Sequence, residues 1–106
     1  MAFESVNPFT GERLATFPGT DPAEVGRILD LAAGAQREWA RAGLAERAVP
    51  MRRMAALLRA RAPELARLMA LEMGKPVRSG LAEVAKSALV CEHFAACAGQ
   101  YLAPRV

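Results

Sequence analysis

The chain has 106 residues, of which 53% are hydrophobic and only 6% aromatic. This length fits one small domain, and an apolar content made mostly of Ala, Leu, Val and Met favours helices that pack closely through small side chains. Fourteen Lys and Arg against eleven Asp and Glu give a net charge of +3. Because Arg and Glu alternate instead of forming a basic stripe, we expect no nucleic-acid partner.

The sequence also predicts no membrane partner. No charged stretch followed by an apolar run opens the chain, and no apolar run approaches the roughly 20 residues that span a bilayer. Cys91 and Cys97 lie six positions apart in one predicted helix, so their side chains point in different directions. They should not form a disulfide with each other, and we expect a reducing, cytoplasmic location.

The opening segment predicts a β-hairpin over residues 3–17. Its centre is the string Asn7-Pro8-Phe9-Thr10-Gly11-Glu12. Asn7 suits the first position of a turn, Pro8 fixes φ at the second, and Gly11 can take the positive φ that a longer hairpin loop requires. A lone hairpin is unstable in water, so another part of the protein must cover it.

A first helix is predicted over about residues 22–41. Asp21 is the expected N-cap, Pro22 fits the first helical position, and Glu24 would complete a capping box. Gly43 should mark the end of this helix. Apolar residues recur at spacings of three and four, which predicts one buried face. That face comprises Val25, Ile28, Leu29, Ala32, Ala35 and Trp39.

Two further helices are predicted over residues 44–61 and 63–73. Pro50 is tolerable only near the first turns of the earlier one, and Pro63 comes too late for that, which places a break near Ala62. Gly74 followed by Lys75-Pro76 is a conventional helix stop. The predicted buried positions are Met51, Met54, Leu57 and Leu58 in the earlier helix and Leu65, Leu68, Met69 and Leu71 in the later one.

A last helix is predicted over residues 79–101. One face holds Leu81, Val84, Ala88, Cys91 or Val90, Phe94, Ala98 and Tyr101. Neither an internal repeat nor a low-complexity tract marks a second domain. The expected fold class is therefore mainly α, with an N-terminal β-hairpin followed by an antiparallel set of helices.

Two patterns invite interpretation as ligand sites. Gly74-Lys75 is similar to the end of a phosphate-binding loop, but Met69 stands where that motif needs Gly, and Pro76 removes a backbone N–H. Cys91, His93 and Cys97 have metal-ligand side chains, yet a closed zinc site needs four ligands, and no other Cys or His occurs in the sequence. We therefore expect a helix terminus, packed thiols and a partly exposed histidine, with no metal site.

The remaining polar and aromatic candidates have structural interpretations. A nucleophilic cysteine needs an oxyanion pocket and an orienting group, which Cys91 and Cys97 lack. Glu72, Glu83 and Lys86 lie near apolar faces, and Glu83 and Lys86 are spaced to pair on a helix surface. Trp39, Phe94 and Tyr101 are expected to be core or interface residues rather than a cofactor box.

Several strings together resemble the opening of the aldehyde dehydrogenase superfamily: Asn7-Pro8-Phe9-Thr10-Gly11-Glu12, Ala45-Glu46-Arg47 and Leu71-Glu72-Met73-Gly74-Lys75-Pro76. The last is the most specific, and the resemblance runs over residues 1–106. The succinate-semialdehyde dehydrogenase branch is the one most resembled, through Phe17-Pro18-Gly19-Thr20-Asp21, Glu83-Val84 with Lys86, and Cys91-Glu92-His93-Phe94.

The resemblance implies the N-terminal fragment of an α/β fold in a subunit of nearly five hundred residues. In that family a Cys thiolate attacks the aldehyde, hydride passes to NAD or NADP, and a Glu-activated water releases the acid. The resemblance places the nucleophilic Cys, the water-activating Glu and the cofactor-binding stretches outside these residues. The catalytic domain and most of the nucleotide-binding domain therefore also lie outside them. We therefore assign no catalytic, cofactor-binding or metal residue here.

The resemblance also implies the partners. The chain would pack against the remainder of a dehydrogenase subunit through a face bearing Val84, Ala88, Cys91 and Phe94. The full-length enzyme would be a homo-oligomer, and this chain alone would be inactive. The alternative interpretation is a free-standing helical module that binds another protein through an exposed apolar face.

Overall fold

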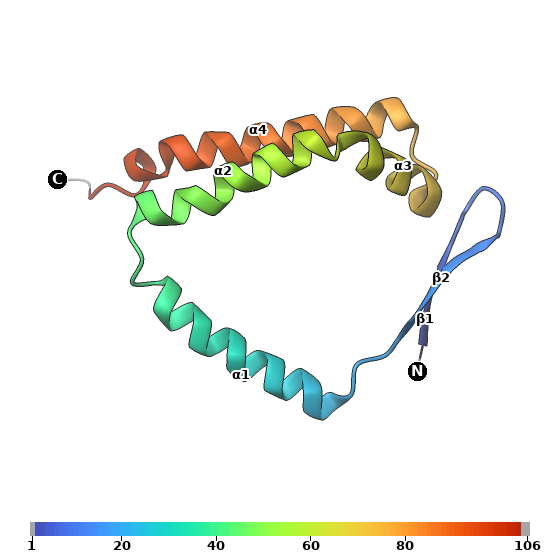
Figure 1. Ribbon diagram of the computed structural model, residues 1–106, viewed down its shortest axis with the longest axis horizontal. Coiled ribbons are helices and arrows are strands. Elements are labelled where there is room, and N and C mark those ends of the chain that lie inside the picture. The colour runs from blue at the N-terminus through green and yellow to red at the C-terminus, as the bar shows by residue number, and fades with distance from the viewer. Residues whose placement is uncertain (1, 105–106) are drawn as a thin grey trace. The chain divides into compact units, whose positions relative to one another are not determined.

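The computed structural model describes residues 2–104, which contain two strands and four helices. The mainly helical class with an N-terminal hairpin is confirmed (Figure 1). The chain divides between residues 42 and 43 into two compact units. The first holds the hairpin and one helix, and the second holds three helices.

The hairpin pairs β1 (Ala2–Val6) with β2 (Arg13–Pro18) in antiparallel register, with Phe3 opposite Phe17 and a register shift between Ser5 and Val6. Asn7 organises the connection: its side-chain oxygen accepts from the backbone N–H of Phe9 at 2.9 Å and of Thr10 at 3.3 Å. Gly11 has φ of 73°, as the turn chemistry predicted. The loop is therefore built by local hydrogen bonds that the sequence specifies.

The helix α1 (Pro22–Trp39) begins as predicted, because the Asp21 carboxylate accepts from the Ala23 N–H at 2.8 Å. The predicted capping box is not formed. Both carboxylate oxygens of Glu24 instead accept from the Arg27 guanidinium, at 2.7 and 2.6 Å. The helix stops at Trp39 rather than residue 41, and Gly43 precedes α2 as its N-cap.

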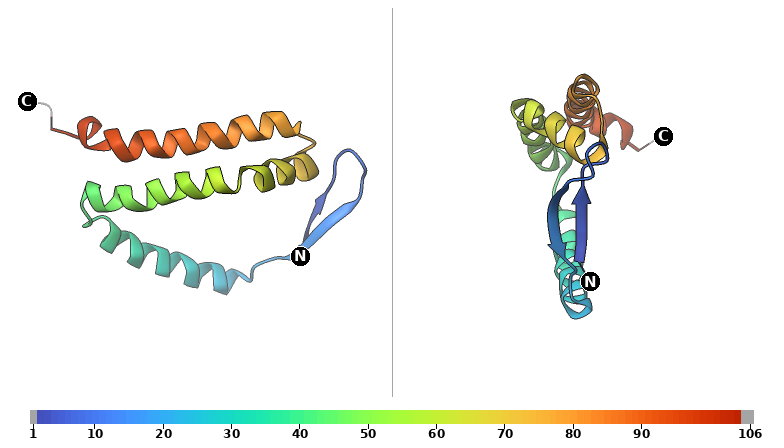
Figure 2. Two further views of the ribbon diagram at one scale, coloured as in Figure 1. Left: turned by 45° about the horizontal axis from the view of Figure 1, so that its top comes forward. Right: turned by 90° about the vertical axis from the view of Figure 1, so that its right-hand side faces the viewer.

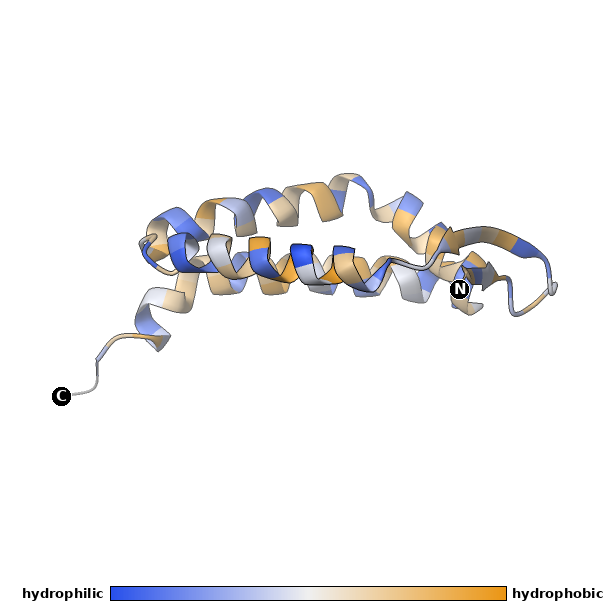
Figure 3. Cartoon of the chain, turned by 90° about the horizontal axis from the view of Figure 1, so that it is seen from below, coloured by the Kyte–Doolittle hydropathy of each residue, from blue (hydrophilic) through white to orange (hydrophobic). Residues whose placement is uncertain are grey.

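The predicted buried face of α1 is wrong for this chain. None of the residues of α1 is buried; Leu29 is 64% exposed and Trp39 47% exposed. The spacing of these apolar residues fits a face for burial, but within the described residues of the first unit nothing covers that face. Hydrophobic positions recur along the helices in the hydropathy view in Figure 3.

The second unit is a helical hairpin. The long helix α4 (Val77–Tyr101) runs back alongside α2 (Leu44–Ala60), and α3 (Ala62–Met73) packs against α4 (Figures 1 and 2). The break between α2 and α3 is at Arg61, which ends one helix and precedes the next. Gly74, in the left-handed conformation with φ of 68°, closes α3 as predicted. Because α4 follows Pro76 directly, it begins two residues before the predicted start at Ser79.

Small side chains form the core of this second unit: Ala48, Ala55, Ala66, Val84 and Ala88. The prediction that Met51, Met54 and Leu57 are buried was wrong, since each is at least 36% exposed. The helices meet through alanine instead, because the short side chain lets two helix backbones approach closely. Of the predicted face of α4, Val84 and Ala88 are buried, whereas Leu81, Phe94 and Tyr101 are exposed.

Gly80 is a point of close approach between α3 and α4. A Cβ atom built on Gly80 would lie 3.0 Å from the Cα of Ala66 and 3.1 Å from its Cβ. Ala66 is completely buried, and Gly80 is buried as well. Only glycine leaves room for this contact, so the packing of the two helices depends on a residue that carries no periodicity signal.

Candidate functional site

The cysteine and histidine side chains of α4 do not form a metal centre. Cys91 and Cys97 are free, half-buried thiols. The Nε2 atom of His93 lies 2.8 Å from the hydroxyl oxygen of Tyr101, two helical turns away. Among residues 2–104, no three His, Cys, Asp or Glu side chains gather closely enough to hold a metal ion. The imidazole therefore has a phenol, not a thiolate, as its neighbour.

His93 belongs to an aromatic cluster near the end of α4. Its ring centroid lies 5.4 Å from that of Phe94 in an edge-to-face arrangement and 5.7 Å from that of Tyr101. Phe94 is 49% exposed, and Tyr101 is also exposed. Phe94 and Tyr101 are thus not core residues in this chain, and the cluster presents aromatic rings at the surface.

The Gly74-Lys75 turn is closed by contacts of its own. Gly74 serves as the end of α3, and the N–H of Gly74 is used by the carbonyl of Ala70. The ammonium of Lys75 forms an ion pair with the carboxylate of Glu83. The predicted Glu83–Lys86 pair is therefore wrong: Lys75 reaches Glu83 because the short connection before α4 leads its side chain along the first turns of that helix. Glu72 lies exposed near the end of α3.

An ion pair joins α2 to α4. The Arg59 guanidinium donates through Nε to one oxygen of Glu92 at 3.1 Å and through Nη2 to the other at 2.7 Å. These hydrogen bonds hold the pKa of Glu92 below its ordinary value and raise the pKa of Arg59. Neither residue was singled out as a pair from the sequence, because they are 33 positions apart.

The pair makes the stability of the second unit depend on pH. A carboxylate whose pKa is lower in the folded state stabilises that state above its unfolded pKa, about 4.3, and this contribution is lost as the pH falls through the folded value. We expect Glu92→Gln to lower Tm slightly at pH 7 and to have a smaller effect near pH 3. Thermal unfolding followed by circular dichroism at both pH values checks this, and an effect of equal size at both would contradict it.

A shallow groove lies where the start of α2 meets the end of α4. Its volume is about 210 Å³, and its walls are Leu44, Arg47, Ala48, Met51, Phe94, Ala95, Ala98 and Leu102. Arg47 is the charged residue among them, and its Nε atom is buried without a hydrogen-bond partner in the described part of the chain. The sequence places Arg47 in the string Ala45-Glu46-Arg47 and gives no sign that its Nε atom would be buried. A buried donor cannot be recognised before the packing of α2 on α4 is known.

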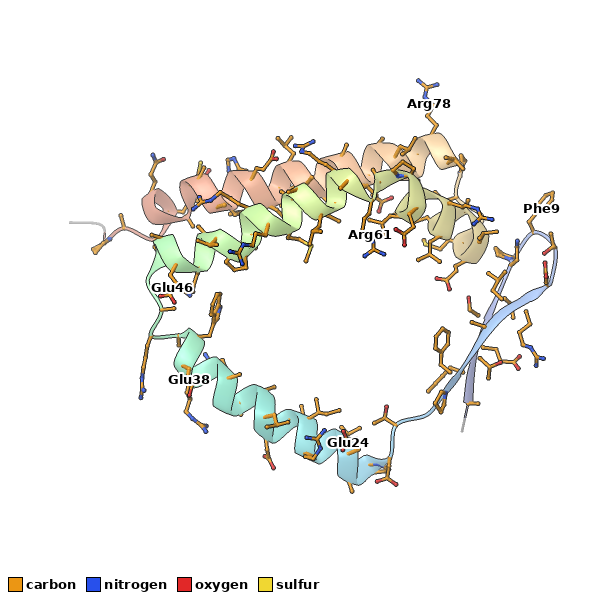
Figure 4. All side chains as sticks on the ribbon, in the orientation of Figure 1. Phe9, Glu24, Glu38, Glu46, Arg61 and Arg78 are labelled. Atoms are coloured by element: carbon orange, nitrogen blue, oxygen red, sulfur yellow. The ribbon has the colours of Figure 1, made fainter. Side chains whose placement is uncertain are left out.

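Large apolar side chains also stand outside the core in the first unit. Phe9 projects from the tip of the hairpin and is 92% exposed (Figure 4). Phe3 and Phe17, which face each other across the strands, are both more than half exposed. Together with the apolar face of α1, these side chains form surfaces typical of binding to another polypeptide.

The described geometry thus comprises an alanine-packed helical hairpin, a turn closed by an ion pair and uncovered apolar faces. No helix over residues 2–104 has the length and apolarity that crossing a lipid bilayer would demand. Several charged and aromatic side chains pair with one another at the surface, whereas the thiols of Cys91 and Cys97 are free and half-buried.

The model of the aldehyde dehydrogenase family matches residues 1–106, and the chain belongs to that family. It is 41% identical over 103 residues to succinate-semialdehyde dehydrogenase (NADP+) of Deinococcus radiodurans, covering 97% of this chain and 22% of that protein. It is 41% identical over 91 residues to the NAD(P)+ succinate semialdehyde dehydrogenase Sad of Escherichia coli K12, covering 86% of this chain and 20% of that protein.

A solved structure agrees with these matches. The chain superposes on the aldehyde dehydrogenase KauB of Pseudomonas aeruginosa with a TM-score of 0.85 and 32% identity, over 94% of this chain and 21% of that one. The chain therefore spans about a fifth of the length of the proteins that it matches. The family assigned from the sequence motifs is confirmed.

Proposed function

We propose that residues 1–106 are the N-terminal architectural part of an NAD(P)-dependent aldehyde dehydrogenase that oxidises succinate semialdehyde to the acid. One observation carries this proposal: nearly the whole chain aligns with about a fifth of two succinate-semialdehyde dehydrogenases at 41% identity. The large apolar side chains left exposed on α1 and the hairpin support it, because a longer subunit would bury them.

The proposal assigns no chemical step to this chain. NAD or NADP would be held by other segments of the enzyme, since the Gly74-Lys75 turn is closed by its own hydrogen bond and ion pair. We likewise propose that Cys91 and Cys97 act in packing, with the aldehyde-attacking thiolate elsewhere. The contribution of these residues would be to position and cover the parts of the subunit that carry out catalysis.

We also propose a partner and a cellular location for this chain. The partner would be the remainder of the same subunit, within a homo-oligomer in the cytoplasm, where the two free thiols stay reduced. The alternative of a free-standing helical interaction module is not favoured, because the family match covers the whole chain.

A chimeric enzyme tests this function. The first segment of the Deinococcus radiodurans relative, 103 aligned residues, is replaced by this chain, and NADP+-dependent oxidation of succinate semialdehyde is measured. We expect turnover by the chimera and none by the 106-residue chain or by the relative without its first segment. Turnover or tight NADP+ binding by the chain alone would contradict the proposal, as would a folded but inactive chimera.

A further inference from the structure

The groove between the start of α2 and the end of α4 combines an apolar lining with one unpartnered donor. Seven of its eight lining residues are Leu, Ala, Met or Phe, and the eighth is Arg47. Arg47 lies in the first turn of α2, where its backbone N–H donates to the carbonyl of Gly43 at 2.9 Å. Arg47 is half-buried, and its Nε atom is buried without an acceptor in the described part of the chain.

A buried guanidinium N–H needs an acceptor. Removing a charged donor from water without replacing the lost hydrogen bond is costly, so such groups are nearly always paired in folded proteins. The acceptor is not found among residues 2–104. Glu46, the preceding residue of α2, forms no ion pair with Arg47 and lies at the edge of the unit (Figure 4).

The identity of the missing acceptor is indicated by three other arginines in this chain. Arg27, Arg59 and Arg61 each present the same edge of the guanidinium, the Nε and Nη2 atoms, to the two oxygens of a glutamate. This side-on contact is the geometry in which arginine and a carboxylate form two parallel hydrogen bonds. In Arg47, the Nε atom at that edge is the one left without a partner.

We propose that this groove binds an acidic segment from the remaining dehydrogenase polypeptide. That segment places a carboxylate at Arg47 Nε and an apolar side chain in the groove. The inference rests on the proposed function, because that function supplies the partner. An apolar side chain would contact Met51 and Phe94, which are both partly exposed. The carboxylate would fix the position of the segment along the groove, because any shift would leave the carboxylate and the Arg47 guanidinium unpaired.

Arg47→Met tests this binding, because methionine keeps much of the length of the side chain and removes its donors. In the 106-residue chain, where the donor has no partner, we expect Tm to stay the same or rise. In the chimera we expect Tm to fall by about 2 °C or more, as the segment loses its charge-assisted hydrogen bonds. Arg47→Lys, which keeps the charge but lacks Nε, should also lower Tm of the chimera.

Arg53→Met is the matched control, since Arg53 is exposed on the same helix and lies outside the groove. It should change Tm equally in both proteins. An Arg47→Met effect of equal sign and size in the chain and in an active chimera would overturn the inference and leave the proposed function standing. A wild-type chimera without activity would instead overturn the proposed function.

A crystal structure of the chimera gives a second, independent test. A carboxylate oxygen of the added polypeptide within hydrogen-bond distance of Arg47 Nε supports this binding. A groove filled by water alone, or by an apolar segment that leaves Nε unpaired, overturns it.

Discussion

Gly80→Val is expected to lower the free energy of unfolding of the second unit by about 2–3 kcal/mol. Its Cβ atom would lie 3.0 Å from the Cα of Ala66, and a backbone atom cannot turn away as a flexible side chain can. The two γ-methyl groups of valine add volume at a place where α3 and α4 already touch. Urea denaturation followed by helical circular dichroism measures the loss.

The controls are alanine substitutions at glycines in helices. A Cβ atom added at Gly26 in α1 or at Gly99 in α4 would meet nothing within 4 Å, so Gly26→Ala and Gly99→Ala should stabilise their helices by up to about 1 kcal/mol. Gly80→Ala carries the same gain in helix propensity but makes the close contact, so it should be less stable than Gly99→Ala. Equal effects at Gly80 and Gly99 would show that α3 and α4 do not meet as closely as described.

Pro50→Ala is expected to raise the free energy of unfolding of the second unit by about 2 kcal/mol, measured by the same urea denaturation. Pro50 lies in the second turn of α2, which continues through it to Ala60. At that position proline has no N–H to donate to the carbonyl four residues earlier, and its ring crowds the preceding turn, at a cost of about 3 kcal/mol. Part of this gain is offset because alanine gives the unfolded chain more freedom.

Pro22 provides the comparison. It occupies the first position of α1, where the N–H would have no helical partner and the fixed φ is favourable. Pro22→Ala should therefore be neutral or slightly destabilising, opposite in sign to Pro50→Ala. If Pro50→Ala instead destabilises the second unit, the prediction is wrong and proline at this position is itself required for α2 to pack along α4.

Local signals for turns and helix ends were the most reliable, although the local contacts predicted for Glu24 and for Glu83 with Lys86 did not form. Asp21 caps a helix because its carboxylate reaches the Ala23 N–H two residues on, and Gly74 ends one because it takes a left-handed conformation. Such contacts involve residues that are close in sequence, so residue type and spacing are sufficient to predict them. The family resemblance was similarly available, since its motifs are contiguous strings.

Predictions of burial failed where burial depended on which other helix packs against the face. Periodicity identified Met51, Met54 and Leu57 as one side of α2, but it could not reveal that alanines would form the contact with α4. The Arg59–Glu92 pair and the unpartnered Nε of Arg47 were missed for the same reason. Both features depend on residues from two helices, and the sequence of one helix does not show which residues of the other lie beside it.

Residue types, spacings and motifs were enough to predict the hairpin, the capping of α1, the end of α3 and the family. Those conclusions need only neighbouring residues or matching strings. The tertiary structure alone decided that Ala66 and Gly80 set the spacing of α3 and α4, and that the larger apolar side chains face outward. Burial and side-chain pairing require two surfaces in contact, and one of the two belongs to a segment that is distant along the chain.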